Sequence, residues 1–356
     1  MSTEPAKAGQ IRSSPRPACR LCGSDGELIY RAQPDRLFGT AGSWNLKQCN
    51  NRDCRLVWLD PMPLEEDLGK AYASYYTHTA AGPPSAAQRQ PSGWARRIYR
   101  LMKRGYLASK YGYEIGTGAF LNRHVGKLLY LFPKRRLQQD LEVRFLSAVP
   151  QGRLLDVGCG QGLWLRSMRE LGWRVDGVDF DERAVKAGAE GGLAIRCGSL
   201  EQQNFSGATF DAVTMSHVIE HLPDPVRTLT ECARILKPGG KLVLWTPNTA
   251  SLGHRVLKQH WRGLEPPRHL HLFSPASLRI LLERAGFDRL SIRTRNSRYI
   301  WQQGLLLRMH QLDLNPGVGA KVAGYLLACA FSLFEAGVLM AKGDAGEWID
   351  AHACKS

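Results

Sequence analysis

The stretch Leu154–Gly162 reads LLDVGCGQG and combines the acid Asp156, the thiol Cys159 and three alternating glycines. The glycines predict a tight turn in which the backbone can approach a ligand closely. An amphipathic helix expected from Leu163 to Leu171 follows, and the free N–H groups at its start favour a carboxylate or a phosphate. The pattern therefore predicts a binding site for a charged group of a small ligand.

A second acid stands at the end of the next expected strand. That strand covers Trp173–Val178 and leads directly into Asp179. A carboxylate at this place can accept hydrogen bonds from the two hydroxyls of a ribose, so Asp179 predicts a nucleoside ligand. The alternative at this point is an ordinary strand–helix–strand unit that binds no nucleotide and uses its glycines for packing.

Two later loops carry side chains that could move a proton or bind a metal. The first follows a strand expected over Phe210–Met215, and the second comes after a strand expected over Lys241–Trp245. Ligands of such sheets bind at the carboxyl ends of the strands, so we expect both loops to face the ligand. The candidates in these loops are Ser216, His217, Glu220, His221, His269 and His271.

Two mechanisms are open for these side chains, and we favour the first. In the first, His221 or His269 is a general base that removes the proton of an acceptor hydroxyl. In the second, a divalent cation lowers the pKa of the acceptor. Nitrogen and oxygen donors of this kind suit zinc, manganese or iron better than magnesium. The ligands of that cation would be His217, Glu220, His221 and either His269 or His271.

Four cysteines near the amino end have the spacing of a zinc site. Two residues separate the members of the first pair and four separate those of the second. Each pair can place two thiolates on one turn, and two turns close a tetrahedral site. Four unlinked buried thiols are the alternative. We expect a structural zinc ion that stabilises this segment and helps to shape the substrate entrance. Its ligands would be Cys19, Cys22, Cys49 and Cys54.

The order of the expected strands and helices is similar to that of a known protein family. The two acids are followed by a strand at Phe210–Met215, a helix at Pro225–Leu236, a turn at Lys237–Gly240 and a strand at Lys241–Trp245. Over about residues 150–295 the chain resembles the class I methyltransferases that depend on S-adenosylmethionine (SAM). The resemblance implies an α/β fold with a doubly wound, Rossmann-like sheet of seven strands. Nicotinamide dehydrogenases fit less well, because their glycines are more widely spaced.

The resemblance also implies which residues bind which part of SAM. The glycine turn would bind the methionine part, Asp156 would organise contacts to its amino group, and Asp179 would bind the ribose. Phe180 would flank the adenine, while Ser199 and Leu200 would reach its edge. The full set expected to bind SAM is Asp156, Gly158, Cys159, Gly160, Gly162, Asp179, Phe180, Ser199, Leu200 and Ser216.

A four-cysteine module joined to such a domain is similar to the sugar methyltransferases of deoxysugar and cell-surface glycan pathways. This likeness implies an O-methyltransferase for a sugar of a nucleotide- or lipid-linked glycan, with functional histidines at His221 and His269 and a substrate-facing Tyr76. Arg268 replaces a glutamate of those enzymes, which argues against methylation of carbon. Ubiquinone-type and small-RNA 2′-O-methyltransferases carry a similar Glu-His pair. A quinone or small-lipid O-methyltransferase with a bound metal is therefore one alternative, and a non-catalytic SAM-binding protein is another.

Charge and composition indicate the partners. The formal net charge of +16 implies an anionic partner, and we expect a phosphorylated acceptor. Between Trp94 and Arg136, eleven basic residues and one acid are interleaved with aromatic residues. Such a segment suits an anionic membrane surface or a solvated helical face around packed aromatics. No nucleic-acid module is visible, so nucleic acid is the least expected partner, and a homo-oligomer stays open.

The chain is expected to be cytoplasmic, with peripheral membrane contact at most, since its start lacks the apolar core of a signal peptide and it contains nine cysteines. A helical insertion at 297–342 precedes the last strand, expected within Gly343–Lys355. The apolar stretch Val322–Met340 is of borderline length for a membrane span and contains Glu335, so we expect a buried, dimer-forming or membrane-surface helix. The expected parts are a disordered tail (1–16), the zinc module (17–60), a linker with a basic helical region (61–149) and the methyltransferase domain (150–356).

Overall fold

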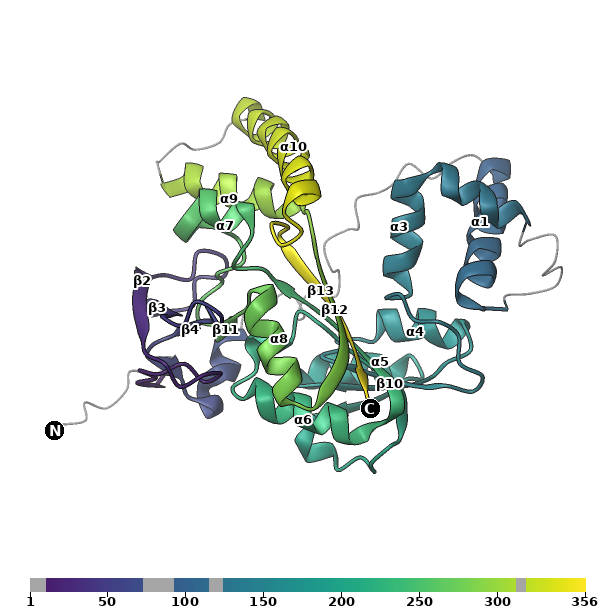
Figure 1. The fold of residues 1–356 in the computed structure, drawn as a ribbon, viewed down its shortest axis with the longest axis horizontal. Helices are drawn as coiled ribbons and strands as arrows, with labels where there is room; N and C mark the ends of the chain where they lie inside the picture. Colours follow the sequence, from purple (N-terminus) through teal and green to yellow (C-terminus); the bar gives the residue numbers. More distant parts are fainter. Residues whose placement is uncertain (1–10, 73–92, 115–123, 312–317) are drawn as a thin grey trace. The chain divides into compact units, whose positions relative to one another are not determined.

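The computed structural model describes residues 11–72, 93–114, 124–311 and 318–356 (Figure 1). Two compact units can be distinguished. Unit 1 contains residues 1–75, 215–233 and 244–356, and unit 2 contains residues 76–214 and 234–243. Tyr76, the expected linker at 80–92 and residues 1–10 of the expected tail lie outside the described residues.

One seven-stranded sheet has the order β12-β13-β10-β9-β6-β7-β8, and β9 and β10 have residues in both units. The neighbours β6, β7 and β8 pair in parallel, as strands joined by helices do. This order confirms the predicted doubly wound, Rossmann-like α/β fold. The strands are β6 (Arg153–Val157), β7 (Arg174–Asp179), β8 (Ala194–Cys197), β9 (Phe210–Ser216), β10 (Leu236–Pro247), β12 (Phe287–Arg295) and β13 (Trp348–Lys355).

Unit 2 forms its core around the parallel strands. Leu154 and Leu155 of β6 are fully buried because strands with both faces covered need apolar residues on both sides. Leu165 and Met168 give α4 one buried face. Two earlier helices, α1 and α3, lie side by side (Figure 1). The helices of unit 2 are α1 (Gly93–Tyr111), η3 (Lys127–Leu131), α3 (Pro133–Glu142), α4 (Leu163–Glu170), α5 (Glu182–Glu190) and η4 (Glu201–Gln203).

The predicted turn at Lys237–Gly240 differs from the structure. Helix α6 (Pro225–Ile235) ends at Ile235, and β10 starts at the next residue, so the turn residues belong to the strand. Lys237 is fixed at this strand start by an ion pair of 2.8 Å with Asp211. The chain therefore passes from helix to strand without the separate turn that the Pro-Gly-Gly sequence suggested.

The cysteine segment of unit 1 forms a small sheet with the order β11-β4-β3-β2. A Cβ on Gly26 would lie 2.3 Å from the Trp58 ring, so only glycine fits there. Strand β11 comes from far along the chain and adds an edge to this module. Residues 13 and 14, predicted as part of the tail, instead form β1 and pair with β5. The elements are β1 (Ser13–Ser14), β2 (Gly26–Gln33), β3 (Trp44–Cys49), β4 (Val57–Leu59), β5 (Met62–Pro63), η1 (Glu65–Tyr72) and β11 (His271–Leu272).

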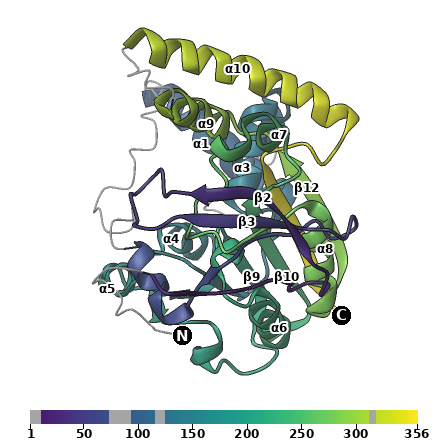
Figure 2. The ribbon, with the colours of Figure 1, turned by 90° about the vertical axis from the view of Figure 1, so that its left-hand side faces the viewer.

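The carboxyl part of unit 1 contains the predicted insertion. The last strand, β13, is antiparallel to β12, and both helices of the insertion lie between these strands in the sequence. Helices α9 and α10 lie side by side (Figures 1 and 2), with the Trp301 and Phe331 rings stacked at 4.7 Å. The helices of this part are η5 (Ile219–His221), α7 (Leu252–Leu257), η6 (Lys258–His260), α8 (Pro275–Arg284), α9 (Arg298–Gln311) and α10 (Val318–Ala341).

Among the described residues, only α10 contains a segment long and apolar enough to cross a membrane, at Val322–Ala341. Only 17% of the most apolar part of this helix is buried within the protein. Glu335 is fully buried, however, and accepts a hydrogen bond of 2.9 Å from Trp301 Nε1 of α9. The helix therefore packs through the face that carries its one acid and exposes an apolar face, instead of being buried throughout.

Candidate functional site

The predicted glycine turn connects β6 to α4 in unit 2. Gly158, Gly160 and Gly162 have φ angles of 70°, 54° and 72°, which favour glycine. The Gly158 N–H donates to the carbonyl of Val178 at 2.7 Å. A Cβ on Gly162 would lie only 2.4 Å from Leu193 Cδ1. The turn thus has the left-handed glycine backbone that the sequence predicts, with Gly162 packed against Leu193, and its role in ligand binding stays a prediction.

Asp156 is buried at the end region of β6, and two side chains hold its carboxylate. Arg144 Nη1 donates to Oδ1 at 2.5 Å, and the Thr214 hydroxyl donates to the same oxygen at 2.6 Å. The Arg144 guanidinium also lies 3.6 Å from the centre of the Trp164 ring. Arg144 balances a carboxylate that would be costly to bury alone. Arg144 was not predicted from the sequence, because it lies outside every motif.

Asp179 lies beside this turn and is fixed by backbone donors. Gly160 N–H donates to one carboxylate oxygen at 2.7 Å, and Asp181 N–H donates to the other at 2.9 Å. Burial raises the pKa of Asp179, although these hydrogen bonds favour the charged form. The next residue, Phe180, is 63% exposed, so its ring is accessible to a flat ligand group. The contacts of Asp179 with a ribose and of Phe180 with an adenine stay predictions.

The other predicted SAM residues of unit 2 have different environments. Burial, followed by the charges of Asp156 and Asp179, raises the pKa of the Cys159 thiol, so it is neutral at pH 7. Ser199 is half-buried, and its N–H donates to Gln202 at 2.9 Å. Leu200 is buried and can supply only an apolar contact. The roles of these residues in SAM binding stay predictions.

In unit 1, the first loop begins where β9 ends at the half-buried Ser216. His217 follows with a φ of 57°, a left-handed conformation that is uncommon for residues with side chains. Its N–H donates to the Trp245 carbonyl at 2.9 Å, and its ring lies 4.4 Å from that of Trp348. Strained backbone of this kind is often retained at functional sites.

Glu220 is fully buried, and its carboxylate has two polar neighbours. His217 Nδ1 lies 3.2 Å from Oε1, and the Thr246 hydroxyl donates to Oε2 at 3.0 Å. Burial alone would raise the pKa of Glu220. The hydrogen bond from His217 and the positive potential of the nearby histidines outweigh burial and hold that pKa at about 2. Glu220 is therefore an ionised acceptor at neutral pH.

His221 and His269 form a close pair, with ring centroids 4.7 Å apart. The His269 Nδ1 lies 2.7 Å from the Gly263 carbonyl, and the His221 Nδ1 lies 3.1 Å from the Arg268 carbonyl. A carbonyl oxygen can only accept, so each Nδ1 carries the hydrogen and each Nε2 has a lone pair. The Tyr72 hydroxyl lies 2.9 Å from the same His221 Nδ1. Both rings are thus oriented to accept a proton, or a metal, at Nε2.

The second loop is held by a buried ion cluster. Arg268 is fully buried, and its guanidinium donates at 2.8 Å to both oxygens of Asp35 and at 3.0 Å to Glu265. Burial alone would raise the pKa of Glu265, but the charges of His269, Arg262 and Arg268 hold it at about 2. Burial lowers the pKa of His269 to about 4. His269 is therefore neutral at pH 7.

The predicted loop residues do not all gather in one place. Glu220, His221 and His269 have ligand atoms within 4.8 Å of one another. His271 is instead buried in β11, where its Nδ1 lies 3.1 Å from the Leu222 carbonyl, as in a structural histidine. Tyr72 is the tyrosine next to His221 among the described residues, while the predicted Tyr76 lies outside them.

The four predicted zinc ligands form one cluster in unit 1. The Sγ atoms of Cys19, Cys22, Cys49 and Cys54 lie within 4.8 Å of one another. A hydrogen bond with Cys54 lowers the pKa of Cys19 to about 5, while burial raises the pKa of Cys49 to about 12. Three of the thiols are buried, and none of the four is in a disulfide. This donor set fits a tetrahedral zinc ion.

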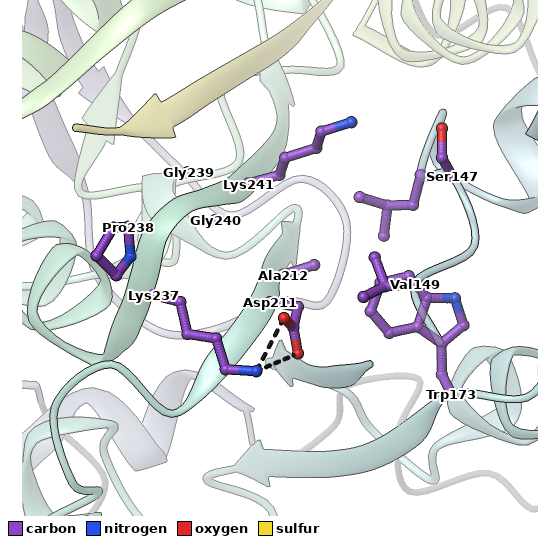
Figure 3. A pocket seen from close by; sticks show the side chains of 11 residues that line it. Ser147, Val149, Trp173, Asp211, Ala212, Lys237, Pro238, Gly239, Gly240 and Lys241 are labelled. Carbon is purple, nitrogen blue, oxygen red and sulfur yellow. Dashed lines mark hydrogen bonds and ion pairs between the residues drawn. The ribbon is translucent and has the colours of Figure 1, made fainter. Parts of the chain in front are cut away.

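Unit 2 also contains a cavity of about 160 Å³ that is separate from the glycine turn. Trp173 and Val149 face it from one side, opposite the Lys237–Asp211 ion pair (Figure 3). Its lining residues stand at the starts of β9 and β10, whereas the glycine turn follows the end of β6. The cavity therefore lies at the other edge of the strands and is not the predicted SAM site.

Comparison with known proteins identifies the kind of domain. Residues 129–292 match a family described as "Methyltransferase domain". The ubiquinone biosynthesis O-methyltransferase of Parvibaculum lavamentivorans is 35% identical over 140 residues, which are 38% of this chain and 53% of that protein. The protein of that name from Xanthomonas axonopodis is 37% identical over 149 residues, 38% of this chain and 62% of that protein. The chain thus spans less than two thirds of the length of these relatives.

Solved structures show weaker similarity. A SAM-dependent methyltransferase from Thermotoga maritima, a possible histamine N-methyltransferase, has 17% identity and a TM-score of 0.41, with 73% of this chain and all of that chain covered. A SAM-dependent methyltransferase from Mesorhizobium loti has 18% identity and a TM-score of 0.42, with coverage of 61% and 97%.

Proposed function

We propose that this chain, which carries a methyltransferase domain at residues 129–292, is a SAM-dependent O-methyltransferase that acts on a phenolic hydroxyl of a quinone-type lipid. The observation that carries the proposal is the histidine pair, in which His221 and His269 each hold Nδ1–H against a carbonyl and keep Nε2 as a lone pair. Such a pair is suited to removing the proton of a hydroxyl.

The residues around the glycine turn would hold SAM. Asp179, fixed by two backbone donors, would accept the ribose hydroxyls through its remaining lone pairs. Asp156, with its charge balanced by Arg144, would orient the amino group of the methionine part. When bound, SAM supplies a sulfonium methyl carbon that is already electrophilic. The protein then has only to hold the acceptor oxygen in line and to remove its proton.

His221 is the proposed general base. Its ring is half-buried, so an acceptor can reach it, whereas His269 is buried. His221 Nε2 takes the hydroxyl proton as the acceptor oxygen bonds to the methyl carbon, and the carbon–sulfur bond breaks with its electron pair going to sulfur. Glu220 stays ionised and stabilises the imidazolium that forms. Tyr72 and the Arg268 carbonyl fix the orientation of the ring.

The proposal includes a structural metal site at the four cysteines and an alternative metal mechanism at the histidine pair. The four-cysteine cluster would hold a structural zinc ion that stabilises the amino-terminal module. Glu220, His221 and His269 also form a donor set that could hold a divalent ion such as zinc, manganese or iron. An ion there would lower the pKa of the acceptor hydroxyl, and His221 would then be a ligand instead of the base.

The acceptor class comes from the relatives. Both relatives described above are ubiquinone biosynthesis O-methyltransferases, which supports the quinone alternative of the sequence analysis over the glycan acceptor favoured there. Ubiquinone has a substituted ring with an apolar tail, so the corresponding acceptor is a phenol that carries an isoprenoid chain. A sugar hydroxyl would need the same base but a polar binding surface.

The test is methyl transfer from radiolabelled SAM to a polyprenyl phenol, with a sugar nucleotide in a parallel reaction. His221→Gln should lower kcat by about a hundredfold or more while the affinity for SAM is unchanged. Asp179→Ala should abolish SAM binding, and His124→Gln, an exposed histidine of unit 2, is the matched control.

The outcomes separate the alternatives. Label in the sugar nucleotide but not in the phenol would refute the quinone acceptor. Full activity of the His221→Gln variant would refute the base. Activity that is lost on chelation and restored by manganese, while the zinc of the cysteine cluster is retained, would replace the base by the metal mechanism. SAM binding without transfer to either acceptor would contradict the proposed activity with both.

A further inference from the structure

One end of the α1–α3 helix pair in unit 2 exposes cationic and large apolar side chains together. The two helices run in the same direction. The guanidinium of Arg135 in α3 lies 5.4 Å from the Tyr99 ring of α1, and further along Asp140 accepts a hydrogen bond of 2.6 Å from Tyr106. Both helices therefore begin at the same end (Figure 1), which we call the basic helix end. Its exposed residues include Trp94, Arg96, Arg97, Leu131, Phe132 and Lys134.

The apolar side chains at this end are unusually exposed. Trp94 is 72% exposed, Leu131 is 73% exposed and Phe132 is 54% exposed. The core of unit 2 does not need them, because Tyr106 and Leu129 already fill the space between α1 and η3 and are fully buried. Large apolar groups in water are costly, so three of them exposed near the starts of these helices indicate a surface that is covered in use.

The charge at the same end has one sign. Neither α1 nor α3 has an acid in its first turn, where helices usually place one. Arg96, Arg97, Lys134 and Arg135 stand there instead and are all exposed. The N-terminal ends of both helices add their own positive potential. The described acids of α3, Asp140 and Glu142, lie further along and pair with Lys110 and Lys103.

We propose that the basic helix end docks on an anionic lipid bilayer, with Trp94, Leu131 and Phe132 inserted below the phosphates. Apolar tips surrounded by cations match the two layers of such a surface, where acyl chains lie beneath charged headgroups. A second copy of the chain is a poor occupant, because two surfaces of the same charge repel. Nucleic acid would match the cations but would leave the aliphatic Leu131 without a partner, since bases stack on rings.

The experiment is flotation of the full-length chain with vesicles of phosphatidylcholine, with and without phosphatidylglycerol, at low and high salt. No SAM or acceptor is present, so the result does not depend on the proposed activity. We expect binding only to the anionic vesicles and weaker binding at high salt. Each basic residue near such a surface contributes about fivefold, so the Arg96→Gln, Arg97→Gln double variant should bind about 25-fold more weakly.

Matched variants keep the test specific. Trp94→Ser and Leu131→Ser should also weaken binding, at unchanged charge. Arg284→Gln with Arg289→Gln removes the same net charge from exposed positions of unit 1 and should have no effect. Unchanged SAM affinity and circular dichroism would show that each variant is folded.

Several results would overturn the proposal. One is the absence of binding to anionic vesicles by the unmodified chain. Another is an equal loss in the unit 1 double variant, which would reduce the effect to net charge. Retention of RNA or DNA, but not of vesicles, with the same dependence on Trp94 and Arg97 would assign the surface to nucleic acid. Self-association that Leu131→Ser abolishes, without vesicle binding, would assign it to a second copy.

Discussion

Glu335 and Glu347 form a buried acidic pair in unit 1 that should make stability depend on pH. Both side chains are fully buried. Trp301 Nε1 donates to Glu335 at 2.9 Å, and Trp261 Nε1 donates to Glu347 at 2.6 Å. Burial and then the negative charge of Glu347 raise the pKa of Glu335 to about 8, and burial raises that of Glu347 to about 7. At least one of the two acids is protonated at neutral pH.

The sign of the pH effect follows from these raised values. An ordinary glutamate in the unfolded chain loses its proton near pH 4.5, whereas the folded pair keeps its protons to about pH 7. The contribution of this pair to the free energy of unfolding is therefore greatest below pH 4.5 and falls as pH rises toward 8. One pKa unit corresponds to about 1.4 kcal/mol, so the rise in the pKa of Glu335 from 4.5 to about 8 removes roughly 4 kcal/mol by pH 8.

The perturbation is Glu335→Gln, which keeps the shape and an acceptor oxygen for Trp301 but removes one of the two acids. The variant should match the unmodified protein to within about 1 kcal/mol at about pH 5 and be more stable by roughly 4 kcal/mol at about pH 8. Urea unfolding followed by circular dichroism at both pH values measures this difference. Glu283→Gln, an exposed glutamate of α8, is the control and should show no pH-dependent gain. A gain for Glu335→Gln that is equal at both pH values would refute the reasoning.

Three further predictions concern the sites. Arg144→Met leaves the Asp156 carboxylate buried without its partner and should lower the free energy of unfolding by about 3 kcal/mol, measured by urea denaturation. Gly162→Ala places a methyl group 2.4 Å from Leu193 at a positive φ; calorimetric titration should show SAM affinity reduced at least tenfold. Metal analysis should find zinc in the unmodified chain, and Cys22→Ser should lose it and lower the Tm; no zinc, or an unchanged zinc content in the variant, would contradict the zinc site.

Local patterns were enough to predict the sheet and the glycine turn. The alternating glycines with positive φ and the acid that ends β7, Asp179, depend on residues that are neighbours in sequence, so local patterns predict them. The last strand was also predicted, because the family resemblance implies a strand within Gly343–Lys355, and β13 lies there, between β12 and β10 in the sheet. The spacing of the four cysteines in two close pairs is likewise visible in the sequence. Their sulfur atoms do form one cluster.

Contacts between distant segments could not be predicted in this way. Arg144 lies in no motif, and only the packing of the residues before β6 brings it to Asp156. Tyr72 was not predicted, because nothing in a run of tyrosines tells which one lies beside His221, and the predicted Tyr76 lies outside the described residues. The same limit explains His271, which the sequence grouped with the reactive histidines although its place in β11 makes it a hydrogen-bonding part of a small sheet.

The cysteine module is best understood as part of the structure that holds the histidine loop. Strand β11 pairs with β4 of the module, and the Leu59 N–H donates to the Leu270 carbonyl at 3.1 Å. Asp35 of the module pairs with the fully buried Arg268, next to His269. Without Asp35 a buried guanidinium would lose one of its two acidic partners, which typically costs about 3 to 5 kcal/mol. Arg268, which stands where the sugar methyltransferases have a glutamate, thus has a structural role here. The ordering of the proposed catalytic loop therefore depends on the folding of the cysteine module.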